Sequence, residues 1–159
     1  MSALEQEATP ATGQDRMQEV MTKAYERYTP EMTRQEFWDQ LDATERAVVF
    51  VGNLNYQVCN GGWPQYADNG YAQAESLNYV LRLCHKMDTP ASKTVAGIIE
   101  KFLPLWKDWK HAEEDRWSAH DTWPGFYENC EPLNEAFYDV NEQWMEDVAV
   151  HVLPDTETR

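Results

Sequence analysis

The stretch from Gln57 to Gly70 constrains the fold more than any other part of the chain, because it interrupts a long apolar helix pattern twice. Gly61 and Gly62 stop the pattern, since glycine tolerates the left-handed conformation that closes a helix. Trp63-Pro64 restarts the chain, because proline suits the first helical turn. Asn69-Gly70 stops it again. We therefore predict two helices joined by a tight elbow at Gly61-Gly62.

The elbow also gathers polar side chains, and these admit two interpretations. Asn53, Gln57, Asn60 and Gln65 surround the break. Amide side chains of this kind often satisfy backbone groups that a broken helix leaves free, which is the interpretation we favour. Contact with a ligand is the alternative. The elbow motif as a whole is interpreted as structural and consists of Asn60, Gly61, Gly62, Trp63, Gln65, Tyr66, Asn69 and Gly70.

Helical periodicity of apolar residues predicts an all-α fold, because the sequence contains no alternating strand pattern and no hairpin dipeptide between apolar runs. Capping boxes at Thr33 and Asp42 predict two of the helix starts. We expect one compact domain of seven to eight helices over residues 15–153, with a loose tail at 1–14 and a short tail at 154–159. The expected helices are 15–28, 33–41, 42–59, 64–68, 73–87, 89–104, 105–117 and 132–152, and 119–131 is expected to be a loop.

The charge of the chain is large and unevenly distributed. The formal net charge is −15, from 28 acidic and 13 basic residues. Such a chain repels phosphate and anionic lipid, so nucleic acid and membranes are unfavourable partners, whereas basic proteins are favoured. Residues 100–159 hold 15 of the acids and only 5 of the bases. A uniform salt-adapted surface does not require this asymmetry, although a purely solubilising role for the charge remains an alternative.

The final predicted helix has the sharpest charge pattern. Its acids are spaced by three or four residues, so they fall on one narrow strip, and the apolar residues fall on the opposite side. Like charges at this spacing destabilise a helix by roughly 0.2–0.5 kcal/mol per pair, which suggests a binding surface for a basic partner. We define the acidic stripe as Glu128, Glu131, Glu135, Asp139, Glu142 and Glu146, with Glu113, Glu114, Asp115 and Asp121 as candidate additional acids.

Other site chemistry is not supported by the sequence. Cys59, Cys84 and Cys130 are odd in number and far apart, which argues against a disulfide framework and favours a reducing cytoplasm. No apolar run is long enough for a membrane span, and no signal peptide pattern is present. A set of His111, Glu114, Asp115 and His120 matches no metal-ligand spacing. We therefore predict no catalytic residue, no metal and no cofactor.

With these residues in view, the chain resembles a family of small acidic bacterial DNA-mimic proteins, the DNA mimic protein nineteen type. The resemblance rests on Asn60-Gly61-Gly62-Trp63-x-Gln65-Tyr66 with Asn69-Gly70, and more weakly on Leu133 to Asp139. It covers roughly residues 42–153. It implies a helical fold and, for the characterised branch, a homodimer whose acidic face occupies the DNA-binding site of a bacterial transcription factor. The family's acidic surface has no short motif, so the resemblance transfers no contact residues.

Three functions follow as hypotheses. The first is a DNA mimic that binds a basic DNA-binding protein, such as a bacterial or phage transcription factor, nucleoid protein or defence protein, and blocks its access to DNA. The second is a helical interaction module or regulator that binds through an apolar patch and is insensitive to salt. The third is an enzyme that uses a deep pocket lined by Asn53, Gln57 and Gln65 together with a histidine. The first is our prediction.

Overall fold

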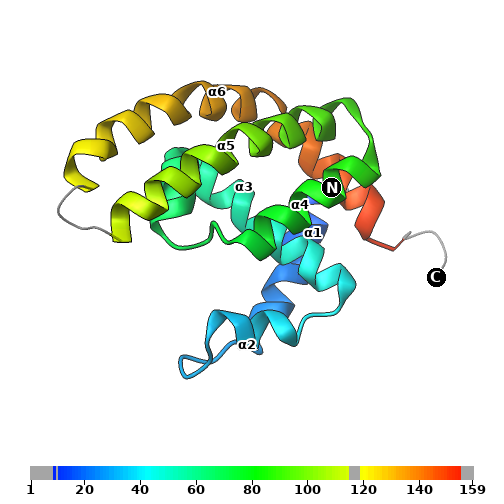
Figure 1. The fold of residues 1–159 in the computed structure, drawn as a ribbon. Coiled ribbons are helices and arrows are strands. Elements are labelled where there is room, and N and C mark those ends of the chain that lie inside the picture. Colours follow the sequence, from blue (N-terminus) through cyan, green and yellow to red (C-terminus); the bar gives the residue numbers. More distant parts are fainter. Residues whose placement is uncertain (1–8, 10, 115–118, 155–159) are drawn as a thin grey trace, which may run out of the picture.

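The computed structural model describes the chain at residue 9 and over residues 11–114 and 119–154. This part of the chain is helical and contains no strand (Figure 1). The all-α prediction is therefore confirmed for it, whereas the predicted division into tails and domain stays a prediction. The helices are α1 (Gly13–Tyr25), α2 (Arg34–Asp39), α3 (Ala43–Asp68), α4 (Ala74–Met87), α5 (Pro90–Glu114) and α6 (Ala119–Val152).

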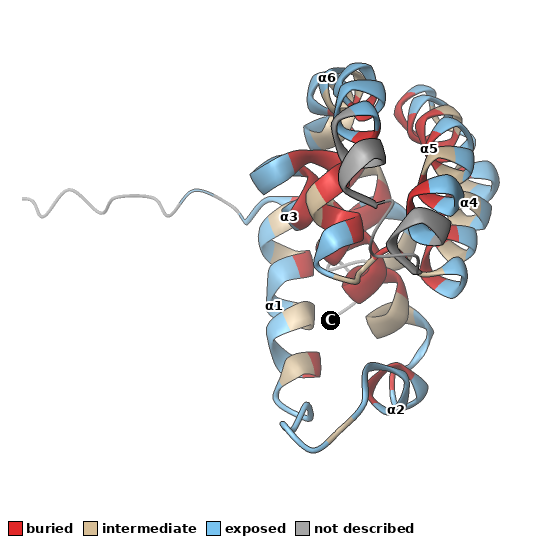
Figure 2. Ribbon diagram, turned by 60° about the vertical axis from the view of Figure 1, so that its left-hand side comes forward, coloured by how far each residue is buried: buried red, intermediate tan, exposed pale blue. Residues whose placement is uncertain are grey.

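The two C-terminal helices, α5 and α6, form the upper layer of the molecule in Figure 1. In Figure 1, α5 and α6 run side by side in opposite directions, and α3 crosses beneath them. α6 also contacts α1 and α4, and α3 contacts α1, α4 and α6. Figure 2 shows buried residues concentrated on α3 and on the inward faces of α5 and α6. The outward side of α6 is thus left facing solvent, while its inward side belongs to the core.

The helices α1, α2 and α3 each begin with a capping box, and the sequence predicted two of these. At Thr33 and Asp42 the side chain accepts a hydrogen bond from the amide three residues later, and the Glu at that position bonds back to the cap. These two capping boxes are confirmed. A third capping box joins Thr12 and Asp15, so α1 begins at Gly13, two residues before the predicted start.

The elbow is confirmed by its backbone angles. Gly61 has φ −152° and ψ 17°, and Gly62 has φ 77° and ψ −179°, so the helical path is broken inside α3. The Trp63 amide, freed by the break, donates to the Asn134 Oδ1 of α6 at 2.8 Å. Gly70, with φ 75°, follows the end of α3. A side chain from α6 therefore accepts a hydrogen bond from the backbone amide that the break in α3 leaves free.

The predicted number of helices was wrong, because two pairs of expected helices each form a single element. The ranges 42–59 and 64–68 make up α3, which continues across the elbow, and 89–104 and 105–117 correspond to α5. The described residues form six helices rather than seven or eight. α5 runs through Pro104 without ending, and residues 119–131, expected to be a loop, belong to α6. A proline inside a helix costs about 3 kcal/mol, so some packing must offset it.

Aromatic packing between α5 and α6 supplies that compensation. The Trp109 ring stacks on Phe126 with centroids 5.4 Å apart, and Phe102 lies 6.3 Å from the same ring. Phe126, Cys130 and Leu133 are all buried. Their spacing of four and three residues is helical, so the buried face of α6 continues through Pro132. The sequence analysis gave more weight to Pro124, Gly125 and Pro132 than to this spacing, and it therefore predicted a loop.

We expect Gly62→Ala to destabilise the protein by about 1–3 kcal/mol, because its backbone conformation is nearly restricted to glycine. An added Cβ would also lie 2.6 Å from Asn134 Nδ2. Gly97→Ala is the matched control, since a Cβ there meets nothing within 4 Å, and we expect it to stabilise α5 by about 0.5–1 kcal/mol. Urea unfolding followed by circular dichroism measures both. Equal effects of the two substitutions would contradict the role of the elbow.

Candidate functional site

Five of the six stripe residues lie exposed on the outer side of α6. Glu128, Glu131, Glu135, Asp139 and Glu142 are all exposed, whereas Phe137, Trp144 and Val148 are buried on the other side of the same helix. Because residues 119–131 are helical, Glu128 stands on the same helix as the others. At about 1.5 Å per residue, the row from Glu128 to Glu142 is about 21 Å long.

The exposed carboxylates have no cationic partner within the described structure. α6 contains eight acidic residues and no Lys or Arg. The ion pairs found among the described residues join other elements, such as Lys23 with Glu19 and Arg27 with Glu45. None of the five exposed stripe residues makes a described hydrogen bond or ion pair. Their charges are therefore available to a partner.

Glu146 differs from the other stripe residues, because it is half-buried and holds α1 in place. Its carboxylate accepts hydrogen bonds from the amides of Gly13, at 3.0 Å, and Gln14, at 3.3 Å. These amides belong to the first turn of α1, where a helix favours a negative charge. The stripe predicted from sequence thus has two parts: five exposed carboxylates and one that anchors α1 to α6.

The candidate additional acids cannot be placed in the same way. Asp115 and the side chains of Glu113, Glu114 and Asp121 lie outside the described part of the structure. The neighbouring helices are less acidic than α6. Together, α4 and α5 contain six Lys or Arg and five acids. The negative charge is thus concentrated on α6 rather than spread over the upper layer.

Hydrogen bonds between polar side chains join the part of α3 before the elbow to the part after it. Gln57 Oε1 accepts hydrogen bonds from Gln65 Nε2, at 3.0 Å, and from Asn69 Nδ2, at 2.8 Å. Asn53 instead bonds the Tyr25 hydroxyl of α1. The prediction that these side chains satisfy backbone amides at the break is therefore wrong for Asn53, Gln57 and Gln65, because their partners are other side chains. The amide at the break is bonded by Asn134, which the sequence analysis did not single out.

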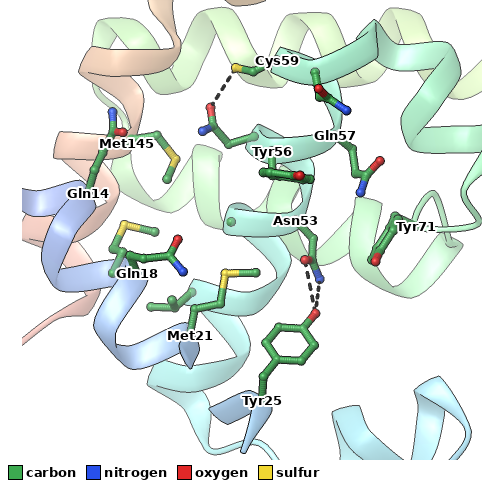
Figure 3. Close-up of a pocket in the computed structure, with 15 residues that line it drawn as sticks. Gln14, Gln18, Met21, Tyr25, Asn53, Tyr56, Gln57, Cys59, Tyr71 and Met145 are labelled. Carbon is green, nitrogen blue, oxygen red and sulfur yellow. Dashed lines mark hydrogen bonds between the residues drawn. The ribbon is translucent and has the colours of Figure 1, made fainter. Parts of the chain in front are cut away.

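A pocket of about 640 Å³ lies between α1 and α3 (Figure 3). Asn53 and Gln57 line it, as the enzyme hypothesis requires, but Gln65 does not, and no histidine is among the lining residues. In Figure 3, Asn53 points toward Tyr25, and Tyr56, Gln57 and Tyr71 lie around the same opening. This arrangement offers neither a general base nor a nucleophile paired with one.

The described residues contain no group of three or more His, Cys, Asp or Glu that could hold a metal ion. The side chains of His111, Glu114 and His120, and residue Asp115, lie outside that search. Within the described helices, none is both long and apolar enough to cross a membrane.

The three cysteines are free and differ in exposure. Cys59 is exposed, whereas Cys84 and Cys130 are buried. Burial raises the pKa of the Cys84 and Cys130 thiols to about 12. The pKa of Cys59 is also raised, first by partial burial and then by the nearby negative charge of Glu142. Because the thiolate is the reactive form, none of these environments activates a cysteine nucleophile.

The fold and the site define an all-helical domain with a broken central helix and an acidic outer helix. A comparison with protein families finds a match to the DMP19-like protein family over residues 39–153. The chain therefore belongs to the DMP19-like family, and the resemblance seen in the elbow motif is confirmed. Searches of curated proteins and of solved structures found no match.

We expect Glu146→Gln to destabilise the protein by about 0.5–2 kcal/mol, because it weakens the cap of α1. Glu135→Gln is the matched control on the same helix, and it should change stability by less than about 0.5 kcal/mol, since Glu135 is exposed and unpaired. Chemical unfolding at low ionic strength measures the difference. A cost for Glu135→Gln as large as that for Glu146→Gln would contradict the assignment.

We expect one of the three thiols to react with an aromatic disulfide reagent at pH 8 in the folded protein, and all three in guanidinium chloride. The reacting residue should be Cys59, so Cys59→Ser should abolish the native reaction. Because the Cys59 pKa is raised, its rate should still be increasing above pH 9, as thiolate continues to form. Rapid native reaction of Cys84 or Cys130 would contradict the burial of these side chains.

Proposed function

We propose that this protein is a non-enzymatic DNA mimic, which binds a basic DNA-binding protein and blocks its access to DNA. One observation supports this most strongly: the row of exposed carboxylates at Glu128, Glu131, Glu135, Asp139 and Glu142, without a described cation to neutralise it. Membership of the DMP19-like family agrees with the proposal. The partner is a transcription factor, a nucleoid protein or a defence protein of the bacterial or phage kind.

The spacing of the row fits one strand of DNA better than a whole duplex. Each strand of B-DNA places a phosphate every 3.4 Å along the axis, which gives about six in 21 Å. The five exposed carboxylates approach that number. The second strand would be represented by further acids, either Glu113, Glu114, Asp115 and Asp121 or the same row on a second copy of the chain in a homodimer.

A carboxylate row of this kind would act mainly on the rate and selectivity of encounter. Carboxylates would occupy the positions of phosphates before the Lys and Arg residues of the partner. Complementary charge accelerates association, and salt screens it over a Debye length of about 10 Å at 0.1 M. The apolar-patch hypothesis predicts instead that binding is insensitive to salt, because burial of apolar surface depends little on moderate salt.

The test compares two charge-reversed proteins with equal net charge. The stripe variant has Glu135→Lys, Asp139→Lys and Glu142→Lys, and the control has Glu26→Lys, Glu31→Lys and Asp108→Lys at exposed acids elsewhere. Wild type should capture a DNA-binding protein from bacterial lysate at low salt. We expect the stripe variant to bind that protein roughly tenfold or more weakly, a change of about 1.4 kcal/mol, and the control to bind almost as wild type does.

Competition completes the test. The captured protein, once purified, is titrated with duplex DNA in the presence of wild type over about 50–200 mM salt. DNA should displace wild type, and binding should weaken as the salt rises. Recovery of no DNA-binding protein at low salt, or equal binding by the stripe variant and the control, would refute the mimic.

A further inference from the structure

The pocket between α1 and α3 has no charged residue in its lining, although charged residues make up 26% of the chain. Its walls come mainly from methionine, tyrosine and amide side chains. Flexible methionines adapt to differently shaped apolar groups, and tyrosines offer large contact areas at little entropic cost. The lining residues that the argument uses are Met21, Gly52, Tyr56, Gln57, Cys59 and Met145.

The pocket opens directly beside the acidic stripe. Cys59 of α3 lines the pocket, and Asn141 Nδ2 of α6 donates to Cys59 Sγ at 3.3 Å. The next residue, Glu142, is close enough for its charge to act on the Cys59 thiol. Met145 of α6 lines the pocket itself. A partner that covers Glu142 on the stripe therefore also reaches the pocket.

A polar group at the pocket wall retains a donor for an incoming ligand. Gln57 is 7% exposed, and Oε1 accepts both of its described hydrogen bonds. Its Nε2 donates to no described residue, although a side-chain amide nitrogen has two N–H groups to offer. A ligand that displaced water from this nitrogen without replacing the hydrogen bond would lose about 1–3 kcal/mol, so an acceptor such as a backbone carbonyl is favoured here.

We propose that this pocket receives an uncharged aromatic side chain, which projects from the basic surface of the same partner that the acidic stripe binds. This inference rests on the proposed function and adds selectivity to it. A row of carboxylates attracts any phosphate-binding face, whereas a pocket favours the partner that has an aromatic residue at the matching place. The volume of about 640 Å³ lies within the usual range for binding pockets and exceeds the needs of one ring.

The experiment uses two short lysine-rich peptides as probes, identical except for a central Phe or Ala. Titrations are followed by calorimetry with wild type, the stripe variant and Gly52→Leu. The leucine fills the pocket, since a Cβ at Gly52 already lies 2.7 Å from the flexible Met21 Sδ. Gly97→Leu is the matched control in α5, away from the pocket. Tyr56→Ala is a second pocket variant, because Tyr56 is 65% exposed and its loss should not affect folding.

We expect the Phe peptide to bind wild type and Gly97→Leu roughly tenfold more tightly than the Ala peptide. This advantage should disappear in Gly52→Leu and shrink in Tyr56→Ala. Equal binding of the two peptides to wild type, or a Phe advantage that survives both pocket variants, would overturn the pocket proposal. The stripe is judged separately: if its reversal leaves the affinity of the Ala peptide unchanged, the mimic proposal fails, whatever the pocket does.

Discussion

The hydrogen bond from the Trp63 amide to Asn134 Oδ1 joins the elbow of α3 to α6 and helps to hold the two helices together. The broken helix leaves this amide without its usual carbonyl partner. Gly62 has no side chain, so Asn134 can approach closely enough to replace that partner. Tyr138, which donates to the Val58 carbonyl, and Asn141, which donates to Asn55, continue the same contact line along α6. Because these three residues of α6 face α3, the acidic stripe on another side of the helix faces solvent.

The same arrangement explains how α6 tolerates its charge. Repulsion among neighbouring carboxylates destabilises the helix by a few tenths of a kcal/mol per pair, while burial of a large apolar side chain contributes about 1.5–3 kcal/mol. Phe137, Trp144 and Val148 are fully buried on the inward side. The inward face thus outweighs the repulsion on the outward face, and the outward face is free to be selected for binding.

Glu146 links the acidic stripe to the pocket. By capping α1 it fixes the helix that forms one wall of the pocket, and Gln14, whose amide it binds, is itself a lining residue. The neutral pocket and the acidic stripe therefore share a boundary at Glu146 and Gln14. In the proposed complex, the row provides general attraction to a basic surface and the pocket provides discrimination among such surfaces.

The sequence alone determined the helical class, the elbow at Gly61-Gly62, the capping boxes and the acidic periodicity, because each depends on residues within about one or two helical turns. The continuity of α5 through Pro104 and of α6 through Pro132 depended instead on aromatic contacts between the two helices, which local rules for proline cannot include. Tertiary structure also decided that Glu146 caps α1 and that Asn134 accepts a hydrogen bond from the free amide at the elbow. These contacts join residues 133 and 71 positions apart, so only the packed chain brings them together.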